Sequence, residues 1–237
     1  SHAIGRRAVA VNLSDLAAMG ARPAWLLLSL VLPATLPLAD FEELVLGVRE
    51  EADRWQATVV GGNITRTPGP LVVDITATGH VRPRRLLRRD TARAGDTLHV
   101  TGTIGGAAAG LAWLQRGGLA GDDPRVARYA TPTPRLREAH ALARERAARA
   151  AIDVSDGLAD AVRQLAAASG LGARIDAAAL PLDPAMAAWA SAAGIDPLTA
   201  AMASDDYELI VAVPPKSGGR LRAARAGLTT PVTPIGV

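Results

Sequence analysis

The stretch "AIDVSDGLAD", residues 151–160, marks a change from an apolar extended run to a helical pattern. Asp153 and Ser155 are two positions apart in the extended part, so their side chains point to the same side. Asp156 and Gly157 then begin a helix whose positive dipole end favours anions. The stretch therefore predicts two carboxylates and one hydroxyl at a single strand-to-helix corner.

Two interpretations of this corner are open. Mg²⁺ binds hard oxygen ligands, usually one or two carboxylates together with substrate phosphates, and helix N-termini bind those phosphates well. Alternatively, Asp156 only caps the helix, and the third acid, Asp160, lies in a solvated turn. Asp153 favours a metal site, because a carboxylate that ends an apolar strand needs a partner or costs stability.

Strand and helix patterns alternate along the whole chain. The predicted strands are 25–32, 57–63, 71–81, 97–102, a run that ends at Asp153, 172–177, 206–215 and a short strand at the C-terminal end. The predicted helices are 4–19, 38–55, 105–116, 135–149, 157–169 and one after residue 215. This interleaving predicts the fold class α/β or α+β.

The arginine-rich segment "RPRRLLRRDTARAGD", residues 82–96, is the best linker candidate. We expect an N-terminal domain over residues 1–93 and a C-terminal α/β domain over residues 94–237. The sequence does not begin with Met and starts almost directly on a helical pattern. We therefore expect that a further N-terminal segment precedes it.

Composition narrows the class of protein. The 237 residues include 26 Lys+Arg and 23 Asp+Glu, for a net charge of +3, and Lys216 is the only lysine. Arginine, which binds phosphate in a bidentate manner, thus carries the cationic chemistry. The absence of cysteine excludes disulfides and thiolate metal sites, and fits a cytoplasmic protein. The longest apolar run, residues 24–39, is broken by Pro33 and Pro37 and is too short to cross a bilayer, so we expect no membrane partner.

Three further motifs could carry chemistry. Asn12 and Asp15 are neighbours on one face of an apolar helix, where polar residues are costly and more often serve a site. "VVGGNITR", residues 59–66, could bring backbone amides to a phosphate, but two glycines are a weak signal and a plain hairpin turn explains them better. "TGTIGGAAAG", residues 101–110, loosely resembles a dinucleotide-binding loop, but tight helix packing explains its glycines better.

Familiar catalytic motifs are absent from the sequence. There is no G-x-x-x-x-G-K-[ST] loop, no kinase H-R-D or D-F-G set and no G-x-S-x-G elbow. The four histidines have no metal-ligand spacing. Phosphoryl transfer by this chain would therefore depend on Mg²⁺, arginine and backbone amides.

Taken together, five blocks of the sequence resemble the thiamine-monophosphate kinases. These kinases belong to the superfamily that also contains aminoimidazole ribonucleotide synthetase and selenophosphate synthetase. The blocks are "GRRAVAVNLSDLAAMGARP", "VVGGNITR", "RRDTARAGDTLHVTGTIGGAAAGL", "AIDVSDGLAD" and "SDDYELIVAVPP". The resemblance implies a two-domain aminoimidazole ribonucleotide synthetase-like fold, with N-terminal sheets that form a barrel in a homodimer. It also implies transfer of the γ-phosphate of ATP onto thiamine monophosphate, with Mg²⁺ as cofactor and thiamine diphosphate as product.

The resemblance also implies roles for particular residues. The metal ligands would be Asp15, Asn63, Asp153 and Asp156, of which Asp153 and Asp156 are the catalytic pair. The ATP contacts would be Gly62, Asn63, Arg89 and Ser155, and Asp205 would face the thiamine phosphate.

Three departures from the family pattern affect these expectations. Asn63 stands where the family usually has Asp, which removes one anionic ligand and predicts weaker Mg²⁺ binding. Asp205 stands where the family usually has Glu, so its carboxylate is shorter. The family's early aspartate motifs and its C-terminal aromatic segment are not in this sequence.

Two alternatives remain open at this point. One is another ATP-using enzyme of the same superfamily. The other is a catalytically weakened nucleotide- or nucleic-acid-binding homologue, suggested by Asn63 and by the arginine cluster within residues 82–89. Aromatic residues make up only 3% of the chain and the net charge is small, so we expect no nucleic-acid partner.

Overall fold

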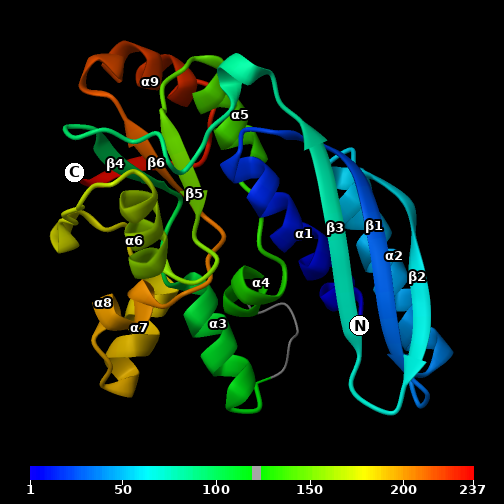
Figure 1. Cartoon of the computed structure of the whole chain (residues 1–237). Coiled ribbons are helices and arrows are strands. Elements are labelled where there is room, and N and C mark those ends of the chain that lie inside the picture. Colours follow the sequence, from blue (N-terminus) through cyan, green and yellow to red (C-terminus); the bar gives the residue numbers. More distant parts are fainter. Residues whose placement is uncertain (119–123) are drawn as a thin grey trace.

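The N-terminal part of the chain is a three-stranded sheet with two helices on one face (Figure 1). The computed structural model describes residues 1–118 and 124–237. The elements are α1 (His2–Ala18), β1 (Arg22–Pro33), α2 (Leu38–Arg54), β2 (Thr58–Thr67) and β3 (Val72–His80). The strand order is β2-β1-β3, with β1 parallel to β2 and antiparallel to β3. The parallel pairing requires a crossover, which α2 provides.

Side-chain alternation along β1 determines which face the helices cover. Leu26 and Leu30 are buried in one apolar core with side chains of α1 and α2. Trp25 and Leu27 point to the other face, and 52% and 46% of their surfaces are exposed. Val72 of β3, which pairs with Val31 of β1, lies on the same second face and is 46% exposed. Within the described residues, this second face carries exposed apolar side chains and no helix covers it.

The C-terminal part is a four-stranded antiparallel sheet with helices on both faces. Its strands, in the order β5-β6-β4-β7, are β4 (Thr97–Thr101), β5 (Ala150–Asp153), β6 (Leu209–Val213) and β7 (Val232–Gly236). The helices are α3 (Gly106–Gln115), α4 (Pro124–Ala130), α5 (Leu136–Arg144), α6 (Leu158–Ala168), α7 (Pro184–Ala193), α8 (Pro197–Met202) and α9 (Gly218–Arg225). Short 3₁₀ helices are η1 (Pro83–Arg85), η2 (Ala177–Ala179) and η3 (Pro215–Ser217).

Alternation along β6 assigns these helices to the two faces of the sheet. Ile210 and Ala212 pack in the core that includes α6, α7 and α8. Val211 and Val213 pack in the other core, with α5, α9 and the N-terminal helices. Since α1 also contacts α5 and β5, the second core joins the two parts of the chain.

The predicted fold class is confirmed, with corrections to single elements. The predicted strand 172–177 is wrong, because this segment makes only an isolated bridge from Ile175 to Gly236 before η2 begins. The predicted helix 135–149 ends at Arg144, and Arg146 has a positive φ of 51°. No helix in the described part of the chain is both long and apolar enough to cross a membrane.

Candidate functional site

Asp153 lies at the end of β5 and meets the N-terminal helix α1. The Ser14 hydroxyl donates a 2.8 Å hydrogen bond to its carboxylate, and both residues are buried. Burial raises the pKa of Asp153 to about 6; the Ser14 hydrogen bond opposes this rise, and the charges of Asp15 and Asp156 add to it. The charges of Asp15 and Asp156 thus both act on the Asp153 carboxylate.

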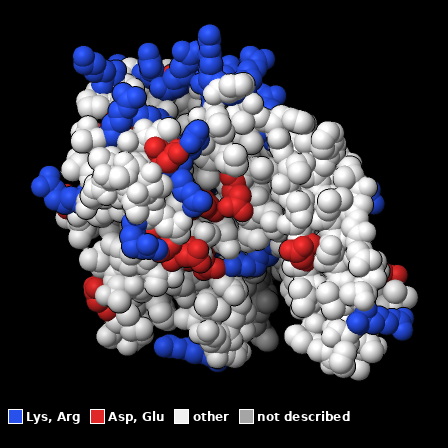
Figure 2. All heavy atoms as spheres, in the orientation of Figure 1, with Lys and Arg blue, Asp and Glu red and all other residues white. Residues whose placement is uncertain are grey.

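A cavity of about 450 Å³ opens beside this corner, and Asp15, Arg89 and Asp153 all line it. Burial raises the pKa of Asp15, whereas the nearby Arg89 guanidinium lowers it. Arg89 is held in place by a 3.1 Å hydrogen bond that it donates to the Gln164 side chain of α6. The lining includes three carboxylates, Asp15, Asp90 and Asp153, and two guanidinium groups, of which Arg88 pairs with Asp90 and Arg89 lies near Asp15. Figure 2 shows acidic and basic groups side by side in this region.

The interpretation of Asp156 as a helix cap is wrong. Gly157 occupies the N-cap position of α6, and no side chain caps the helix. Gly157 has a φ of +95°, and a Cβ there would lie 2.4 Å from the Met202 carbonyl oxygen, so glycine is required. Asp156 is exposed, and in the described part of the chain its carboxylate makes no hydrogen bond or ion pair. It is therefore free to bind a ligand.

Asp160 does not belong to the corner. Its carboxylate accepts hydrogen bonds from Arg163 and Gln164 of its own helix, which lower its pKa. Ser155, which lies between Asp153 and Asp156, is half-buried. Of the quoted stretch, Asp153, Ser155 and Asp156 thus remain as candidates.

The segment 204–208 lies against the corner. The Tyr207 amide donates to the Val154 carbonyl at 2.9 Å, and Tyr207 has a positive φ of 54°. A side chain held in this sparsely populated conformation indicates a local constraint of the kind found at functional sites. Asp205 accepts a 2.6 Å hydrogen bond from Arg7 of α1. The Arg7 guanidinium carbon lies 4.4 Å from the centre of the Tyr129 ring and 5.4 Å from that of Tyr207.

The alternate residues of the same segment point inward and have structural roles. Asp206 accepts hydrogen bonds from the Gly105 and Ala107 amides, at 2.6 and 2.9 Å. Glu208 is fully buried and pairs with Arg135. Asp206 therefore occupies two backbone amides of the glycine-rich loop, and Ser204 accepts a third, from Ala108. This favours the packing explanation for residues 101–110 over a dinucleotide-binding loop.

Gly62 and Asn63 lie apart from the cavity in a single chain. They are on the edge strand β2, where they pair with Leu28 and Ser29 of β1, and Asn63 is exposed. A Cβ on Gly62 would lie 1.8 Å from the Leu28 carbonyl oxygen, so close strand packing by itself requires glycine there. The described residues that line the cavity do not include Gly62 or Asn63. Their assignment to the site stays a prediction.

Sequence reasoning missed Arg7, Ser14 and Tyr207. Arg7 and Ser14 are seven positions apart, which is about two helical turns, so helical spacing could have placed them on one face of α1. Asn12, which was expected to serve the site with Asp15, instead donates a 2.9 Å hydrogen bond to the Ala8 carbonyl of its own helix. No pattern in the sequence indicates the conformation of Tyr207.

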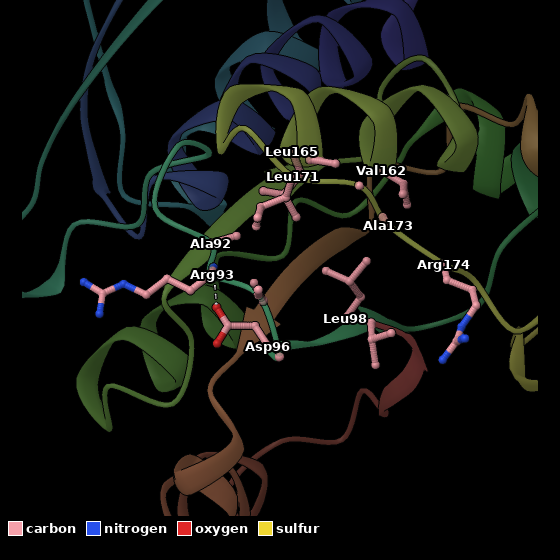
Figure 3. Close-up of a pocket in the computed structure, with 15 residues that line it drawn as sticks. Ala92, Arg93, Asp96, Leu98, Val162, Leu165, Leu171, Ala173 and Arg174 are labelled. Atoms are coloured by element: carbon pink, nitrogen blue, oxygen red, sulfur yellow. Dashed lines mark hydrogen bonds between the residues drawn. The ribbon is translucent and has the colours of Figure 1, made fainter.

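An apolar cavity of about 630 Å³ lies elsewhere, between α6 and the turn before β4 (Figure 3). Leu98, Val162 and Leu165 form part of its walls. Asp96 in this cavity accepts a 2.9 Å hydrogen bond from the Arg93 amide, shown as a dashed line, and thereby stabilises the turn. None of the predicted site residues lines this cavity in the described part of the chain.

Comparisons with known protein families cover both parts of the chain. Residues 1–81 match the family described as AIR synthase related protein, N-terminal domain, and residues 93–237 match its C-terminal domain. The thiamine-monophosphate kinase of Salmonella typhimurium is 40% identical over 245 residues, which cover 97% of this chain and 70% of the relative. The Escherichia coli enzyme of the same name is 39% identical over 243 residues, with the same coverage.

Solved structures of related proteins also resemble this chain over almost its whole length. The thiamine-monophosphate kinase from Stenotrophomonas maltophilia superposes with a TM-score of 0.89 at 38% identity, covering 99% of this chain and 75% of the other. The structure described as AaThiL complexed with AMPPCP and TMP gives a TM-score of 0.87 at 30% identity, covering 99% and 73%. The chain therefore belongs to the AIR synthase related protein family and, within it, to the thiamine-monophosphate kinases.

Proposed function

We propose that the chain transfers the γ-phosphate of ATP to thiamine monophosphate at the corner formed by Asp15, Asp153 and Asp156. The observation that carries this proposal is the Ser14–Asp153 hydrogen bond, which joins α1 to β5 beside a cavity that Arg89 also lines. The relatives named thiamine-monophosphate kinase support the reaction, as does the related AaThiL structure, which holds AMPPCP and TMP. We further propose a cytoplasmic location, because the reaction consumes ATP.

The acidic corner fits Mg²⁺ that arrives with the nucleotide. Within residues 1–118 and 124–237, no group of three or more acidic or histidine side chains lies close enough together to hold a metal ion. Mg²⁺ commonly keeps several waters and binds one or two carboxylates together with substrate phosphates, so an open set of carboxylates suits it. Asp15, Asp153 and Asp156 would hold the ion. When bound, it would neutralise negative charge on the phosphate oxygens.

The chemistry requires positioning more than proton transfer. An oxygen of the thiamine monophosphate phosphate group attacks the γ-phosphorus. The bond from the γ-phosphorus to the bridging oxygen breaks, and ADP leaves. A phosphate monoester is largely ionised near neutral pH, so its oxygen needs no general base. We therefore propose that Asp153 and Asp156 would bind Mg²⁺, and that Arg89 and Ser155 contact the ATP phosphates.

Asp205 is assigned to the substrate through Arg7. A carboxylate beside a phosphate repels it, whereas the Arg7 guanidinium attracts it. The 2.6 Å hydrogen bond to Asp205 and the stacking on Tyr129 and Tyr207 fix the direction of that guanidinium. We propose that Asp205 positions Arg7 and that Arg7 contacts the phosphate of thiamine monophosphate.

A homodimer follows from the uncovered face of the N-terminal sheet. Trp25, Leu27 and Val72 are each about half exposed and lie on this one face of the sheet. We propose that two copies bring these sheets together, as a barrel. Gly62 and Asn63 lie on β2 of this sheet, and we propose that they act in the site of the assembled dimer.

The test is a product analysis with two acceptors. Purified protein with ATP, Mg²⁺ and thiamine monophosphate should yield ADP and thiamine diphosphate in equal amounts. Unphosphorylated thiamine, the matched acceptor, should yield neither product. Absence of thiamine diphosphate over a wide range of Mg²⁺ concentrations would contradict the proposal. Turnover with an aminoimidazole precursor instead would assign the chain to another activity of the superfamily.

A further inference from the structure

A second hydrophilic cavity, of about 600 Å³, lies between the two parts of the chain and is lined by arginine. We name it the arginine cleft and define it by Arg22, Arg82, Arg85, Arg137 and Arg144. Arg22 comes from β1, Arg82 and Arg85 from the linker around η1, and the other two from α5. The described residues that line it include no Asp or Glu. Figure 2 shows basic groups, almost without acidic ones, at the end of the molecule where α5 and α9 lie in Figure 1.

Most of these guanidinium groups have no protein partner. In the described part of the chain, the side chains of Arg22, Arg82, Arg85 and Arg137 make no hydrogen bond or ion pair. Arg144 pairs with Glu145 at 2.8 Å. Arginines that support the core behave differently: the core arginines Arg6, Arg128, Arg135 and Arg149 each pair with a carboxylate. Unpaired like charges that face one hollow repel one another, and a bound anion would remove that repulsion.

The lining indicates which anion fits. The guanidinium fork binds phosphate oxygens in pairs, and arginines on opposite walls suit a ligand with several linked anionic groups. The volume is in the usual range for small-molecule sites. No Phe, Tyr or Trp is among the described lining residues, so no aromatic side chain is available to stack on a nucleobase.

The two histidines of the cavity both make contacts within the protein. His140 uses its Nε2 in a 2.9 Å hydrogen bond with the Ala21 carbonyl oxygen. Burial and the nearby Arg22 lower its pKa, so it stays neutral at neutral pH. His80 packs edge-on against Trp25, with 5.5 Å between ring centroids. Anion binding in the cleft therefore depends on the arginines.

We propose that the arginine cleft binds a small polyphosphate anion, a chain of two or more linked phosphate groups, at a site separate from the Asp15–Asp153 cavity. The linker divides between the two cavities: Arg82 and Arg85 line the cleft, whereas Arg89 lines the acidic cavity. The two cavities are adjacent, since Met19 lines one and Gly20 lines the other. They differ in chemistry, because the described residues that line the arginine cleft include no carboxylate with which to hold Mg²⁺.

The test is titration calorimetry with tripolyphosphate, in a low-salt buffer that contains EDTA, on two charge-matched double variants. Arg85→Gln/Arg137→Gln removes two charges from the cleft. Arg220→Gln/Arg222→Gln removes two exposed charges of α9 outside it. Loss of two phosphate contacts should weaken binding roughly tenfold or more, whereas the control should change it less than about threefold. The four replaced side chains make no hydrogen bond or ion pair with the described residues, so both variants should fold, which thermal unfolding checks.

Other measurements separate this proposal from the proposed function. The cleft variant should retain wild-type turnover of thiamine monophosphate, and Arg89→Gln should retain tripolyphosphate binding. If both double variants lost the same amount of tripolyphosphate affinity, the anion would be attracted by the overall positive charge and not by the cleft. That result would overturn the proposal. So would loss of binding in Arg89→Gln, which would assign the probe to the acidic cavity. A single-stranded oligonucleotide could instead bind more tightly than tripolyphosphate, and the cleft variant could lose that binding. This result would overturn the proposal, and the ligand of the cleft would then be nucleic acid.

Discussion

The Ser14 hydroxyl on α1 donates a 2.8 Å hydrogen bond to the Asp153 carboxylate at the end of β5. The two residues are 139 positions apart, and both are buried. The contact fixes the helix that carries Asp15 against the strand that leads to Asp156. Two parts of the chain that are distant in sequence thus form one acidic corner.

The raised pKa of Asp153 predicts the sign of a stability change. Its folded-state pKa is about 6, against an ordinary value of 3.8, so the folded chain binds this proton more tightly than the unfolded chain. Wild-type stability should therefore fall as pH rises from about 4 to 6 and stay low above that range. Ionisation at pH 8 costs the folded state up to about 3 kcal/mol. Asp153→Asn should thus raise the melting temperature at pH 8 by roughly 5 °C in metal-free buffer.

Three comparisons check this interpretation of Asp153. Near pH 4, wild type and Asp153→Asn should melt together, because the wild-type carboxyl is then protonated. Asp156→Asn, at an exposed position, should leave the melting temperature almost unchanged at both pH values. Adding Mg²⁺ at pH 8 should stabilise wild type more than Asp153→Asn. A fall in the melting temperature of Asp153→Asn at pH 8 would mean that the charge is structural.

Asn63 predicts weak binding of Mg²⁺, and one substitution at this position should strengthen that binding. Asn63→Asp restores an anionic oxygen, which binds Mg²⁺ more strongly than an amide carbonyl. The Mg²⁺ concentration for half-maximal turnover should fall several-fold, while Asn63→Ala should raise it. Steady-state rates at fixed ATP measure both effects. Identical Mg²⁺ curves for all three proteins would remove Asn63 from the site.

The Arg7–Asp205 pair predicts non-additive effects on substrate binding. Arg7→Gln should raise the KM for thiamine monophosphate roughly tenfold or more, since a charge-assisted phosphate contact is lost. Asp205→Asn should raise it less, because Arg7 remains but is less firmly held. If Asp205 acts through Arg7, the double variant should match Arg7→Gln alone.

The control for this pair is Arg49→Gln, which removes an exposed charge from α2 and should leave KM unchanged. Equal KM values for Arg7→Gln and wild type would exclude Arg7 from substrate binding. Multiplicative KM effects in the Arg7/Asp205 double variant would mean instead that Asp205 contacts the substrate directly.

The uncovered sheet face predicts which substitutions dissociate the dimer. Leu27→Glu and Val72→Glu place a charge on apolar positions of this face that are each 46% exposed in a single chain. Sedimentation at micromolar concentration should show a dimer for wild type and a monomer for each variant. Ile195→Glu, at another exposed apolar position, should remain dimeric. A monomeric wild type would contradict the assembly, as would dissociation of Ile195→Glu.

Periodicity predicted most of the fold. The apolar run in β1 and the amphipathic pattern of α2 depend on local sequence, so both elements were found. The predicted strand 172–177 failed because nothing local indicates whether a neighbouring strand is available, and only Ile175 forms a bridge. Helices α7 and α8 gave little periodic signal, yet Asp183 and Asp196 cap them and each precedes a proline. Those caps are local signals that sequence reasoning could have used.

The candidate site was predicted only in part, because its contacts are long-range. Asp15 and Asp153 were identified from their unfavourable positions in apolar elements, and they line one cavity. The Arg7–Asp205 contact spans 198 positions, and no spacing rule reaches that far. Asp206 resembles a site residue in sequence but caps α3, which only the structure reveals.

If the acidic corner carries out phosphoryl transfer, Asp15→Asn should abolish the reaction without unfolding the chain. The measurement is thiamine diphosphate formed per ADP released, followed by phosphorus NMR for wild type and this variant. Wild type should form one thiamine diphosphate per ADP, and Asp15→Asn, folded to the same melting temperature or higher, should form almost none. Undiminished thiamine diphosphate formation by Asp15→Asn would contradict the account.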